Sequence, residues 1–592
     1  MSTRRVQSSV IKPRTLGAAA AVTPWVRNPS WLPLTAASDT DQRFRGLVAV
    51  FPQGAYLAFN VVGGTGYTVD WGDGTSENIS SNTQANRLIA FSSLSADTSA
   101  PVSLTIATDR VGRTSHGYSN GMEVRFYNIV STTGLVTAQT YYVINATAND
   151  FQVSLTVGGS AINLATSNGT ATLLPYRQAI VNITPQSGQN ITSLDLTRRN
   201  VTTGLQAYET GWLDIEVGSP NFTSLNLGGT NVRFAMCERA AVRSFGSVTN
   251  LSNLFNTFRK LQAVVIGNTA SVTNVTSMFQ GCTSLVEAPF FNTVAVTNMS
   301  SLFSGCASLL NVPLYNTAAV TNMGSAFFSC TSLVTVPLFN TAAVTSMASM
   351  FQNCTLLSAV PLFNTAAVTG MNNMLISCAT LTTIPLLNTA AVQNMNNMFQ
   401  ACRELVTIPL LNTAAVTAMN NMFNTCPCLI GVPLLNTAAV TGMSNMFVNC
   451  SSLTTVPLFN TAAVTNMQQM FDGCSSLVTI PLFNTALNTN MVATFRNCTS
   501  LSSIPALNVS AVPSSGAFAN MFQNCNSLSR IQAANFNYTF SVASCRLGAT
   551  ELDEIYTNLP TVTGQTITVS NNVGTTGDDP TIATAKGWTV TG

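Results

Sequence analysis

The chain of 592 residues is rich in hydrophobic residues (46%) and poor in charged ones (8%, against about a quarter in an average soluble protein), with a net charge of +2. No stretch reaches the roughly 18 uninterrupted apolar residues of a membrane-spanning helix, and this apolar content with so little net charge argues against disorder. The lack of a Lys/Arg-dense segment also disfavours nucleic-acid binding.

Residues 1–45 are expected to form an extended arm that anchors the chain to another protein. The segment combines basic residues with two tryptophans in a proline-containing stretch, and the residues expected to make the contact are Arg4, Arg5, Arg14, Trp25 and Trp31. The Ala-rich run over 16–22 also resembles the core of an export signal. Because the run is short and leads directly into Pro24, we favour the arm.

Residues 46–190 are predicted to form an immunoglobulin-like β-sandwich. Strand-like segments lead into the stretch 67–75, Tyr-Thr-Val-Asp-Trp-Gly-Asp-Gly-Thr. This stretch resembles the hairpin of PKD-type immunoglobulin-like sandwiches, although the usual Phe is missing. Because Asp-Gly is a turn-forming pair, Asp70 and Asp73 are expected in a turn, and calcium binding by these residues is the alternative.

A separate small β module is expected near 101–175. Short alternating segments recur through this region, and residues 176–186 have the pattern of a final sandwich strand. The module is therefore predicted to be an insertion within the sandwich. The single histidine of the chain, His116, follows Arg113 in a polar turn without a Ser/Asp pair at catalytic spacing, so a surface position is favoured over catalysis.

A repeat of 24 residues covers residues 248–530 and is the main evidence for the architecture of this region. Cysteines recur at this spacing from Cys282 to Cys498, and prolines do so from Pro289 to Pro505. Such a constant period is typical of a solenoid, in which each coil contacts only its neighbours. We expect a leucine-rich-repeat solenoid in which each coil contains one short strand and one helical turn.

Both ends of the array are expected to be capped. Residues 191–247 contain strand-like segments that lead into the first coil. Residues 531–592 are predicted to form an α/β cap with a helix over 547–559 and a second helix starting near Pro580. The fold as a whole is thus predicted to be β-rich and multidomain.

Within one coil, the segment 309–316, Leu-x-x-Val-x-Leu-x-Asn, follows the leucine-rich-repeat pattern. Strand alternation directs Val312 and Leu314 into the core and Tyr315 outward. Asn316 is expected to point inward and to form an asparagine ladder with equivalent residues of neighbouring coils. The second half of the coil carries apolar residues at spacings typical of one face of a helical turn: Val320, Met323, Phe327 and Cys330.

The run from Asn460 to Leu477, Asn-Thr-Ala-Ala-Val-Thr-Asn-Met-Gln-Gln-Met-Phe-Asp-Gly-Cys-Ser-Ser-Leu, resembles the BspA-type leucine-rich repeats. These repeats occur in bacterial surface proteins and mycoplasma lipoproteins. The chain carries Pro-Leu-Phe-Asn or Pro-Leu-Leu-Asn where the family usually has Leu-Asp-Leu-Ser, so the acid of the strand is missing and no family ligand is carried over. The order of arm, sandwich, insert, repeat and cap also resembles virion structural proteins of tailed marine phages.

The cysteines that recur from Cys282 to Cys498, which we call the cysteine column, are expected to be free, buried thiols that fill the core as small apolar groups. Stacked coils place equivalent side chains about 4.8 Å apart and parallel, which is poor geometry for a disulfide. Metal binding is the other alternative, but Cys426 and Cys428 form an isolated pair without further ligands. We expect neither a metal nor a cofactor.

The position two residues after each proline is expected to form an exposed apolar stripe. Its members are Phe291, Tyr315, Phe339, Phe363, Leu387, Leu411, Leu435, Phe459, Phe483 and Leu507. An exposed stripe of this size is typical of a binding face or of a contact with a second subunit. The alternative is that strand twist partly buries the stripe.

These patterns favour a binding protein over an enzyme. No carboxylate pair recurs at one position of the repeat, so an acid and a base for cleaving sugars are not expected. The favoured hypothesis is a phage virion structural protein on the tail or capsid surface, anchored by its arm to other virion proteins and presenting the solenoid to a host receptor or a second subunit. The alternative is a secreted bacterial cell-surface adhesin of the BspA type. Neither hypothesis includes nucleic-acid binding or membrane insertion.

Overall fold

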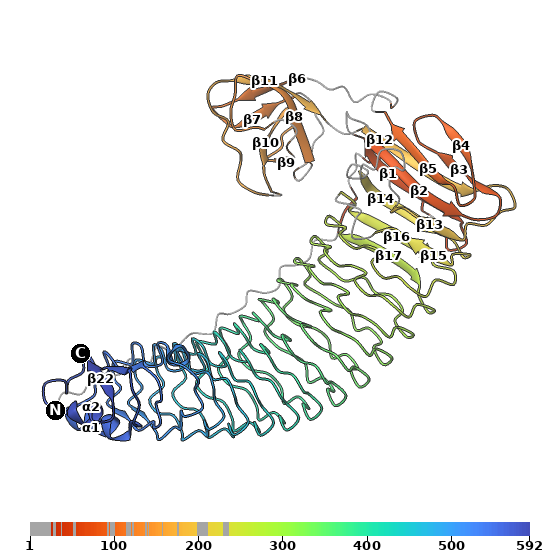
Figure 1. The fold of residues 1–592 in the computed structure, drawn as a ribbon. Coiled ribbons are helices and arrows are strands. Elements are labelled where there is room, and N and C mark those ends of the chain that lie inside the picture. Colours follow the sequence, from red (N-terminus) through yellow and green to blue (C-terminus); the bar gives the residue numbers. More distant parts are fainter. Residues whose placement is uncertain are drawn as a thin grey trace, which may run out of the picture.

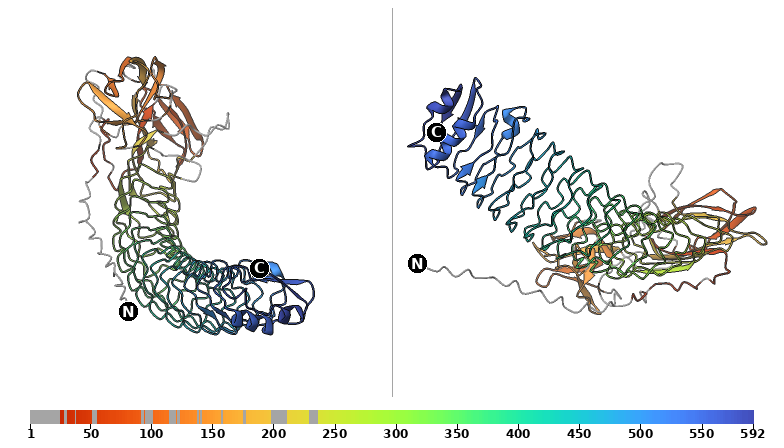
Figure 2. Two further views of the ribbon diagram at one scale, coloured as in Figure 1. Left: turned by 90° about the vertical axis from the view of Figure 1, so that its left-hand side faces the viewer. Right: turned by 90° about the horizontal axis from the view of Figure 1, so that it is seen from below.

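A computed structural model of the chain shows a crescent (Figures 1 and 2). It describes residues 25–27, 31–36, 38–50, 55–90, 94, 101–113, 120, 123–136, 139, 141–156, 158–174, 177–197, 211–228 and 236–592. A β-sandwich and a small barrel form one end of the crescent, and two short helices, α1 (Ala549–Asn558) and α2 (Thr581–Thr584), lie at the other. The coils of a solenoid stack side by side between these ends.

Two sheets face each other in the sandwich. The larger sheet has the order β17-β16-β14-β1-β12-β3-β4 and consists of β1 (Arg43–Val50), β3 (Gly66–Asp70), β4 (Ser76–Ser80), β12 (Arg177–Pro185), β14 (Trp212–Gly218), β16 (Arg239–Ser244) and β17 (Ala263–Asn268). The smaller sheet has the order β15-β13-β2-β5 and consists of β2 (Ala55–Val62), β5 (Gln84–Ile89), β13 (Ser193–Asp195) and β15 (Ser224–Asn226). Phe59 and Trp71 are fully buried between the sheets, with ring centroids 5.4 Å apart.

Both sheets of the sandwich continue into the solenoid. β1 pairs antiparallel with β14, and from there β14, β16 and β17 run parallel to one another. β13 and β15 are also parallel, and bridges between Asn250, Asn274 and equivalent residues of later coils follow them. A single apolar core extends from Phe44 to Trp588. The region 191–247 therefore contains the first coils, which are joined directly to the sandwich.

The segment between β5 and β12 folds into a closed barrel with the strand order β10-β7-β6-β11-β8-β9. Its strands are β6 (Pro101–Thr105), β7 (Arg110–Gly112), β8 (Glu123–Val130), β9 (Tyr141–Ile144), β10 (Asp150–Ser154) and β11 (Gly169–Leu174). The barrel has its own core around Phe126 and Phe151. Because β12 then pairs with β1 and β3, the barrel is an insertion at the place where the sequence predicts the β module. His116 lies outside the described residues.

Regular strands stop where the prolines begin. Residues 269–502 are all described and contain no strand; the next are β18 (Ser503–Ile504) and β19 (Arg530–Ile531), which pair with each other. Proline has no N–H to donate, so each coil loses a ladder bond at this position. Backbone bonds between coils persist just before the proline, as from the N–H of Leu310 to the carbonyl of Val286 at 2.8 Å. The short strand expected in each coil is thus reduced to isolated bonds.

The second half of each coil is a series of tight turns, and the prediction of a helical turn there is wrong. Ser325 and Ser329 have left-handed backbone conformations, with φ of 57° and 56°, which a right-handed helix excludes. The N–H groups of Ser325 and Phe327 donate to the carbonyls of Ala348 and Met350 in the next coil, at 2.9 and 3.0 Å. These turns therefore hold neighbouring coils together through the backbone.

The C-terminal end of the solenoid is closed by helices and a small sheet. A 3₁₀ helix, η2 (Ser515–Phe518), is followed by a parallel sheet of β20 (Phe540–Ser541), β21 (Gln565–Thr568) and β22 (Trp588–Thr591). α1 lies within the segment 547–559 predicted as a helix and buries Leu552 and Ile555, and α2 begins directly after Pro580. None of the helices in the described part of the chain combines the length and the apolar character required to cross a bilayer.

The described part of the N-terminal arm packs against the larger sheet of its own chain. Trp31 is only 5% exposed and lies against Leu47 of β1 and Leu213 of β14. The indole N–H of Trp25 donates to Oε2 of Glu238 at 3.2 Å. The expectation that Trp31 anchors the chain to another protein is therefore wrong, because its indole is buried within the chain, whereas Trp25 is half-buried and its anchoring role stays a prediction. The other anchoring candidates lie outside the described residues: Arg4, Arg5 and Arg14.

Candidate binding surface

The stripe predicted to be exposed is buried. Its members are between 1% and 4% exposed: Phe291, Tyr315, Phe339, Phe363, Leu387, Leu411, Leu435, Phe459, Phe483 and Leu507. Their side chains belong to the core, where successive phenyl rings stack in parallel. The prediction of a binding face at these positions is therefore wrong.

The prediction fails because strand alternation breaks at the proline. The N–H of Phe363 donates to the carbonyl of Pro361 at 2.8 Å, and Phe459 makes the same bond to Pro457 at 2.9 Å. Such a bond closes a three-residue turn, which shifts the inward and outward positions by one residue. The leucine at the centre of the turn points outward, and Leu362 is 61% exposed.

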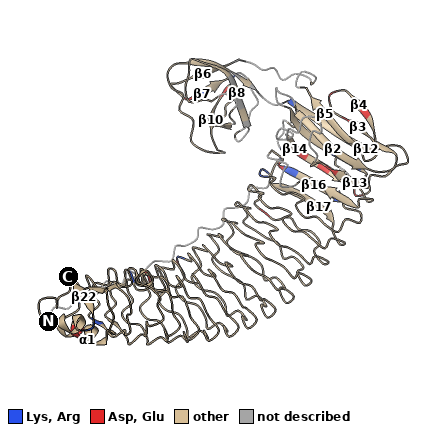
Figure 3. Ribbon diagram, in the orientation of Figure 1, with Lys and Arg blue, Asp and Glu red and all other residues tan. Residues whose placement is uncertain are grey.

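A different apolar row is therefore exposed, which we call the leucine stripe. It consists of the residue directly after each proline, with exposures between 58% and 72%: Phe290, Leu314, Leu338, Leu362, Leu386, Leu410, Leu434, Leu458 and Leu482. Charged residues gather at the sandwich and the cap, and the coils between them carry few (Figure 3). A large exposed apolar patch marks an interaction site in most soluble proteins, so this row of nine exposed apolar side chains is a candidate binding surface.

Phenylalanine rings of neighbouring coils are farther apart just inside the leucine stripe than in the column of the core. In the core, the rings of Phe327 and Phe351 have centroids 5.6 Å apart, whereas those of Phe339 and Phe363, just inside the stripe, are 6.4 Å apart. Because the rings of these two pairs are nearly parallel, with interplanar angles of 4° and 7°, the distances measure the local spacing of the coils. Hydrogen-bonded strands lie about 4.8 Å apart. The spacing of parallel rings is thus wider in the column just inside the leucine stripe. Because a curved solenoid has its wider spacing on the convex side, we infer that the stripe lies on the outer edge of the crescent.

Threonine side chains link the coils beneath the leucine stripe. Thr341 is fully buried, and its Oγ1 donates to the carbonyl of Asn364 in the next coil at 2.7 Å, with equivalent bonds in neighbouring coils. Asn316, in contrast, is exposed, and its Oδ1 accepts the N–H of Ala318 at 3.2 Å within the same coil. The predicted asparagine ladder is therefore wrong. A bond through a side chain spans more distance than a backbone bond, which fits the wider spacing here.

The cysteine column consists of free, buried thiols, as the sequence predicts. Sγ of Cys354 donates to the carbonyl of Phe327 at 3.0 Å. Burial raises the pKa of Cys354 and of Cys450 to about 12, so both thiols stay protonated at neutral pH. Within the described ranges, no three His, Cys, Asp or Glu side chains gather closely enough to hold a metal ion.

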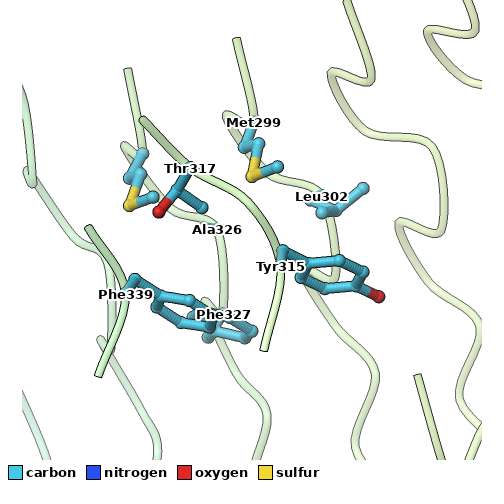
Figure 4. A pocket seen from close by; sticks show the side chains of 8 residues that line it. Met299, Leu302, Tyr315, Thr317, Ala326, Phe327 and Phe339 are labelled. Carbon is cyan, nitrogen blue, oxygen red and sulfur yellow. The ribbon is translucent and has the colours of Figure 1, made fainter. Parts of the chain in front are cut away.

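The coil around Ala326 has a small side chain at a core position. Ala326 stands where the next coil carries Met350, and the shortened side chain leaves an apolar cavity of about 10 Å³. Figure 4 shows the side chains that converge on it: Met299, Leu302, Tyr315, Thr317, Met323, Ala326, Phe327 and Phe339. A cavity this small and apolar holds neither a ligand nor a hydrogen-bonded water. It is a packing defect of the core.

Buried charges lie under the arm. Asp214 and Glu216 of β14 are at most 1% exposed, and their carboxylates form ion pairs of 2.6–2.9 Å with Arg27, Arg239 and Arg243. Arg27 also donates to two backbone carbonyls of the arm. Because each carboxylate is paired with arginine, the cluster fixes the arm on the sheet and leaves no free acid for chemistry.

The predicted turn is present: Asp70 is the last residue of β3, and Asp73 lies in the turn between β3 and β4. Oδ1 of Asp70 accepts the N–H of Gly72 at 3.0 Å, and Asp73 pairs with Arg87 at 2.9 Å. Burial raises the pKa of Asp73, but hydrogen bonds from Thr75 and Arg87 outweigh it and lower that pKa below its usual value. An arginine already neutralises the Asp73 carboxylate, so the geometry favours the turn over calcium binding.

The solenoid is similar in sequence to one protein family. A family model described as a Mycoplasma protein of unknown function, DUF285, matches residues 243–336, 334–429 and 426–536. Together these matches span just under half of the chain. No curated protein matches the sequence.

Solved structures similar to this chain include bacterial leucine-rich-repeat proteins. A leucine-rich repeat protein from Eubacterium ventriosum is 20% identical with a TM-score of 0.32, and the match covers 58% of this chain and 85% of that one. The leucine-rich repeat protein TpLRR of T. pallidum is 20% identical with a TM-score of 0.20, and the match covers 36% of this chain and 83% of that one. The repeat region is thus similar in sequence to a mycoplasma family and has bacterial leucine-rich-repeat proteins among its structural neighbours.

Proposed function

We propose that this chain is a non-enzymatic structural protein that binds another protein through the outer edge of its solenoid. The observation that supports this proposal is the leucine stripe, in which nine apolar side chains on successive coils are each 58–72% exposed. The scaffold beneath is rigid, because stacked rings and hydrogen bonds between coils fix every coil against the next. A rigid, uncharged apolar row is suited to a protein partner.

The described polar groups of the coils support binding rather than catalysis. The carboxylate of Asp472 is paired with Arg496 and accepts a bond from Asn497 at 3.0 Å. The thiols from Cys282 to Cys498 that recur every 24 residues, the other candidate nucleophiles, are buried, and burial raises the pKa of Cys354 to about 12. A paired acid and a protonated thiol supply neither a general base nor a nucleophile at neutral pH.

In its more specific form, the proposal places the chain on the surface of a phage virion, where the solenoid serves host attachment. The order of the modules along the sequence supports this form, and Arg4, Arg5 and Arg14 remain the proposed contacts to other virion proteins. The alternative, a secreted bacterial adhesin of the BspA type, is favoured by the match to a Mycoplasma family.

Gold-labelled antibody against the solenoid, applied to purified particles and to the cells that produce the protein, separates these forms. Label on intact particles is the expected result. Label on the bacterial surface but not on particles supports the adhesin and contradicts the virion form, and label confined to the cell interior contradicts both.

The binding role is tested by the triple variant Leu338→Ser, Leu362→Ser and Leu386→Ser. We expect attachment of the purified protein to host cells to fall at least tenfold, because three central members of the leucine stripe become polar. The control is Leu88→Ser, which changes a leucine of β5 that is 56% exposed and lies outside the solenoid. Equal attachment of the triple variant and the control would show that the stripe is not the binding surface.

A further inference from the structure

We propose that the leucine stripe binds an extended polypeptide segment that carries an apolar side chain at every second residue and runs along the outer edge of the solenoid. This inference rests on the proposed protein-binding function and specifies the chemistry of the partner. Three features of the described coils carry it: the spacing of the stripe, its backbone donors and the sameness of its coils.

The spacing of the coils matches the repeat of an extended chain. A strand advances about 3.3–3.4 Å per residue, so the side chains on one face recur every 6.6–6.8 Å or so. The ring columns just inside the stripe have a spacing of 6.4 Å, both between Phe339 and Phe363 and between Phe459 and Phe483. The leucines lie farther out on the wider edge, so their spacing is at least as large. Two residues of an extended segment therefore advance by about one coil.

The backbone of the stripe offers hydrogen-bond donors at the same interval. The N–H groups of Leu338, Leu362 and Leu386 donate to no described residue, because the proline before each leucine ends the pairing between coils. In an extended segment the carbonyls that point to one side also recur every second residue. One carbonyl of the partner can thus meet one donor in each coil while its apolar side chains pack between successive leucines.

The sameness of the coils favours a periodic partner. Along the leucine stripe each coil from Leu314 to Leu482 presents leucine after proline and asparagine two positions later. A globular partner binds mainly through a few distinct residues at the centre of an interface. An extended segment uses every coil equally, and nine coils accommodate about 18 residues at two residues per coil. A second copy fits less well, because two outer edges curve away from each other and touch over few coils.

The test uses fluorescein-labelled peptides of 6, 10 and 18 residues with Val at every second position and Ser, Thr or Gln between. An 18-residue isomer with the same composition but with Val in adjacent pairs serves as the control peptide. Binding to the full-length protein is measured by fluorescence anisotropy at peptide concentrations shown by sedimentation to be monomeric. We expect affinity to rise with each length and the alternating 18-residue peptide to bind at least tenfold more tightly than its isomer.

The variants then locate the peptide. The triple variant Leu338→Ser, Leu362→Ser and Leu386→Ser should lower the affinity at least tenfold, whereas Leu88→Ser should leave it unchanged. Equal binding of the two isomers, affinity independent of length, or an unaffected triple variant would overturn the inference. If the triple variant loses attachment to cells but no peptide binds, the inference falls and the proposed function stands. Loss of self-association in the triple variant without peptide binding would instead assign the stripe to a second copy.

Discussion

The solenoid has two kinds of coil: the strand coils, which contain β14, β16 and β17, and the proline coils that follow, which contain the prolines from Pro289 to Pro505. The two kinds differ in the bonds that join one coil to the next. In the strand coils the backbone forms a parallel ladder along whole strands, as between Ala240 and Val264 and their neighbours. In the proline coils this ladder is broken at one edge, and columns of threonine, cysteine and phenylalanine side chains connect the coils there and through the core. The comparison shows that a solenoid can replace part of its ladder with side chains, and that the edge where it does so becomes wider and exposes leucine.

The largest expected effect is that of high pH, which should lower the free energy of unfolding of the proline coils. The unfolded chain ionises its thiols near pH 9, whereas burial raises the pKa of Cys354 and Cys450 to about 12 in the folded state. Below pH 9 both states keep the proton and stability does not change. Between pH 9 and 12 only the unfolded state loses it, so stability falls by about 1.4 kcal/mol per pH unit for each such thiol.

Chemical denaturation at pH 8, 9, 10 and 11 measures this loss. The double variant Cys354→Ala and Cys450→Ala should show a shallower decrease with pH than the natural sequence. A stability that is flat up to pH 11, or a slope that the double variant leaves unchanged, would contradict the assignment of the cysteines to the buried core.

The strand coils should instead depend on the arm. Trp31→Ala removes a buried indole from the face of β14 and should destabilise this end of the molecule by about 3–5 kcal/mol. Hydrogen exchange should show lost protection in β14 and β16 and unchanged protection in the proline coils. Leu32→Ala, at a side chain that is 42% exposed, is the matched control and should have an effect within about 0.5 kcal/mol. Loss of protection throughout the solenoid would show that the two regions do not differ in this way.

Removing a threonine hydroxyl that links two coils should lower the stability clearly only where that threonine is buried. Thr341→Val removes the hydrogen bond from a fully buried hydroxyl to the carbonyl of Asn364 and should cost about 0.5–1.5 kcal/mol, the usual net contribution of such a bond. Thr345 makes a similar bond to the carbonyl of Thr321 at 3.1 Å but is exposed, so water can replace it, and Thr345→Val should cost less than about 0.5 kcal/mol. Equal losses in thermal unfolding of the two variants would rule out a special role for the buried column.

The smallest expected effect is a gain in stability. Ala326→Met restores the methionine that the next coil has in Met350 and fills the cavity, which should stabilise the protein by about 1 kcal/mol. Ala342→Met, at an exposed alanine, should give no gain. The midpoint of urea denaturation measures both variants. Destabilisation by Ala326→Met would mean that the surrounding side chains already close the gap.

The sequence predicts the solenoid well because its period is set by the spacing of buried residues. Cys354, Val344 and Met347 all occupy the core at the expected intervals. It predicts the surface poorly, because the prediction extended strand alternation through Pro361, where the bond from the N–H of Phe363 to the carbonyl of Pro361 closes a turn that exposes Leu362 and buries Phe363. A proline inside every presumed strand is itself evidence against regular alternation.

The arm shows a second limit of prediction from sequence. Tryptophans in a proline-containing segment indicate that the segment packs on something, but composition does not say whether the surface belongs to the same chain. The acceptors are Asp214 for Arg27 and Glu238 for Trp25, both some two hundred residues away in the sequence. No local pattern connects residues so far apart, and only the fold brings them together.

The orientation of the Pro-Leu-Phe segment is the central claim, and cysteine labelling tests it most directly. In a Cys428→Ser background, which removes the one half-buried thiol, Leu362→Cys and Phe363→Cys differ only in which side of the coil the new thiol occupies. Reaction with a maleimide at pH 7 should label Leu362→Cys at nearly the rate of the unfolded protein and leave Phe363→Cys protected. Faster labelling of Phe363→Cys than of Leu362→Cys would show that the phenylalanine stripe is outside and that the leucine stripe does not exist.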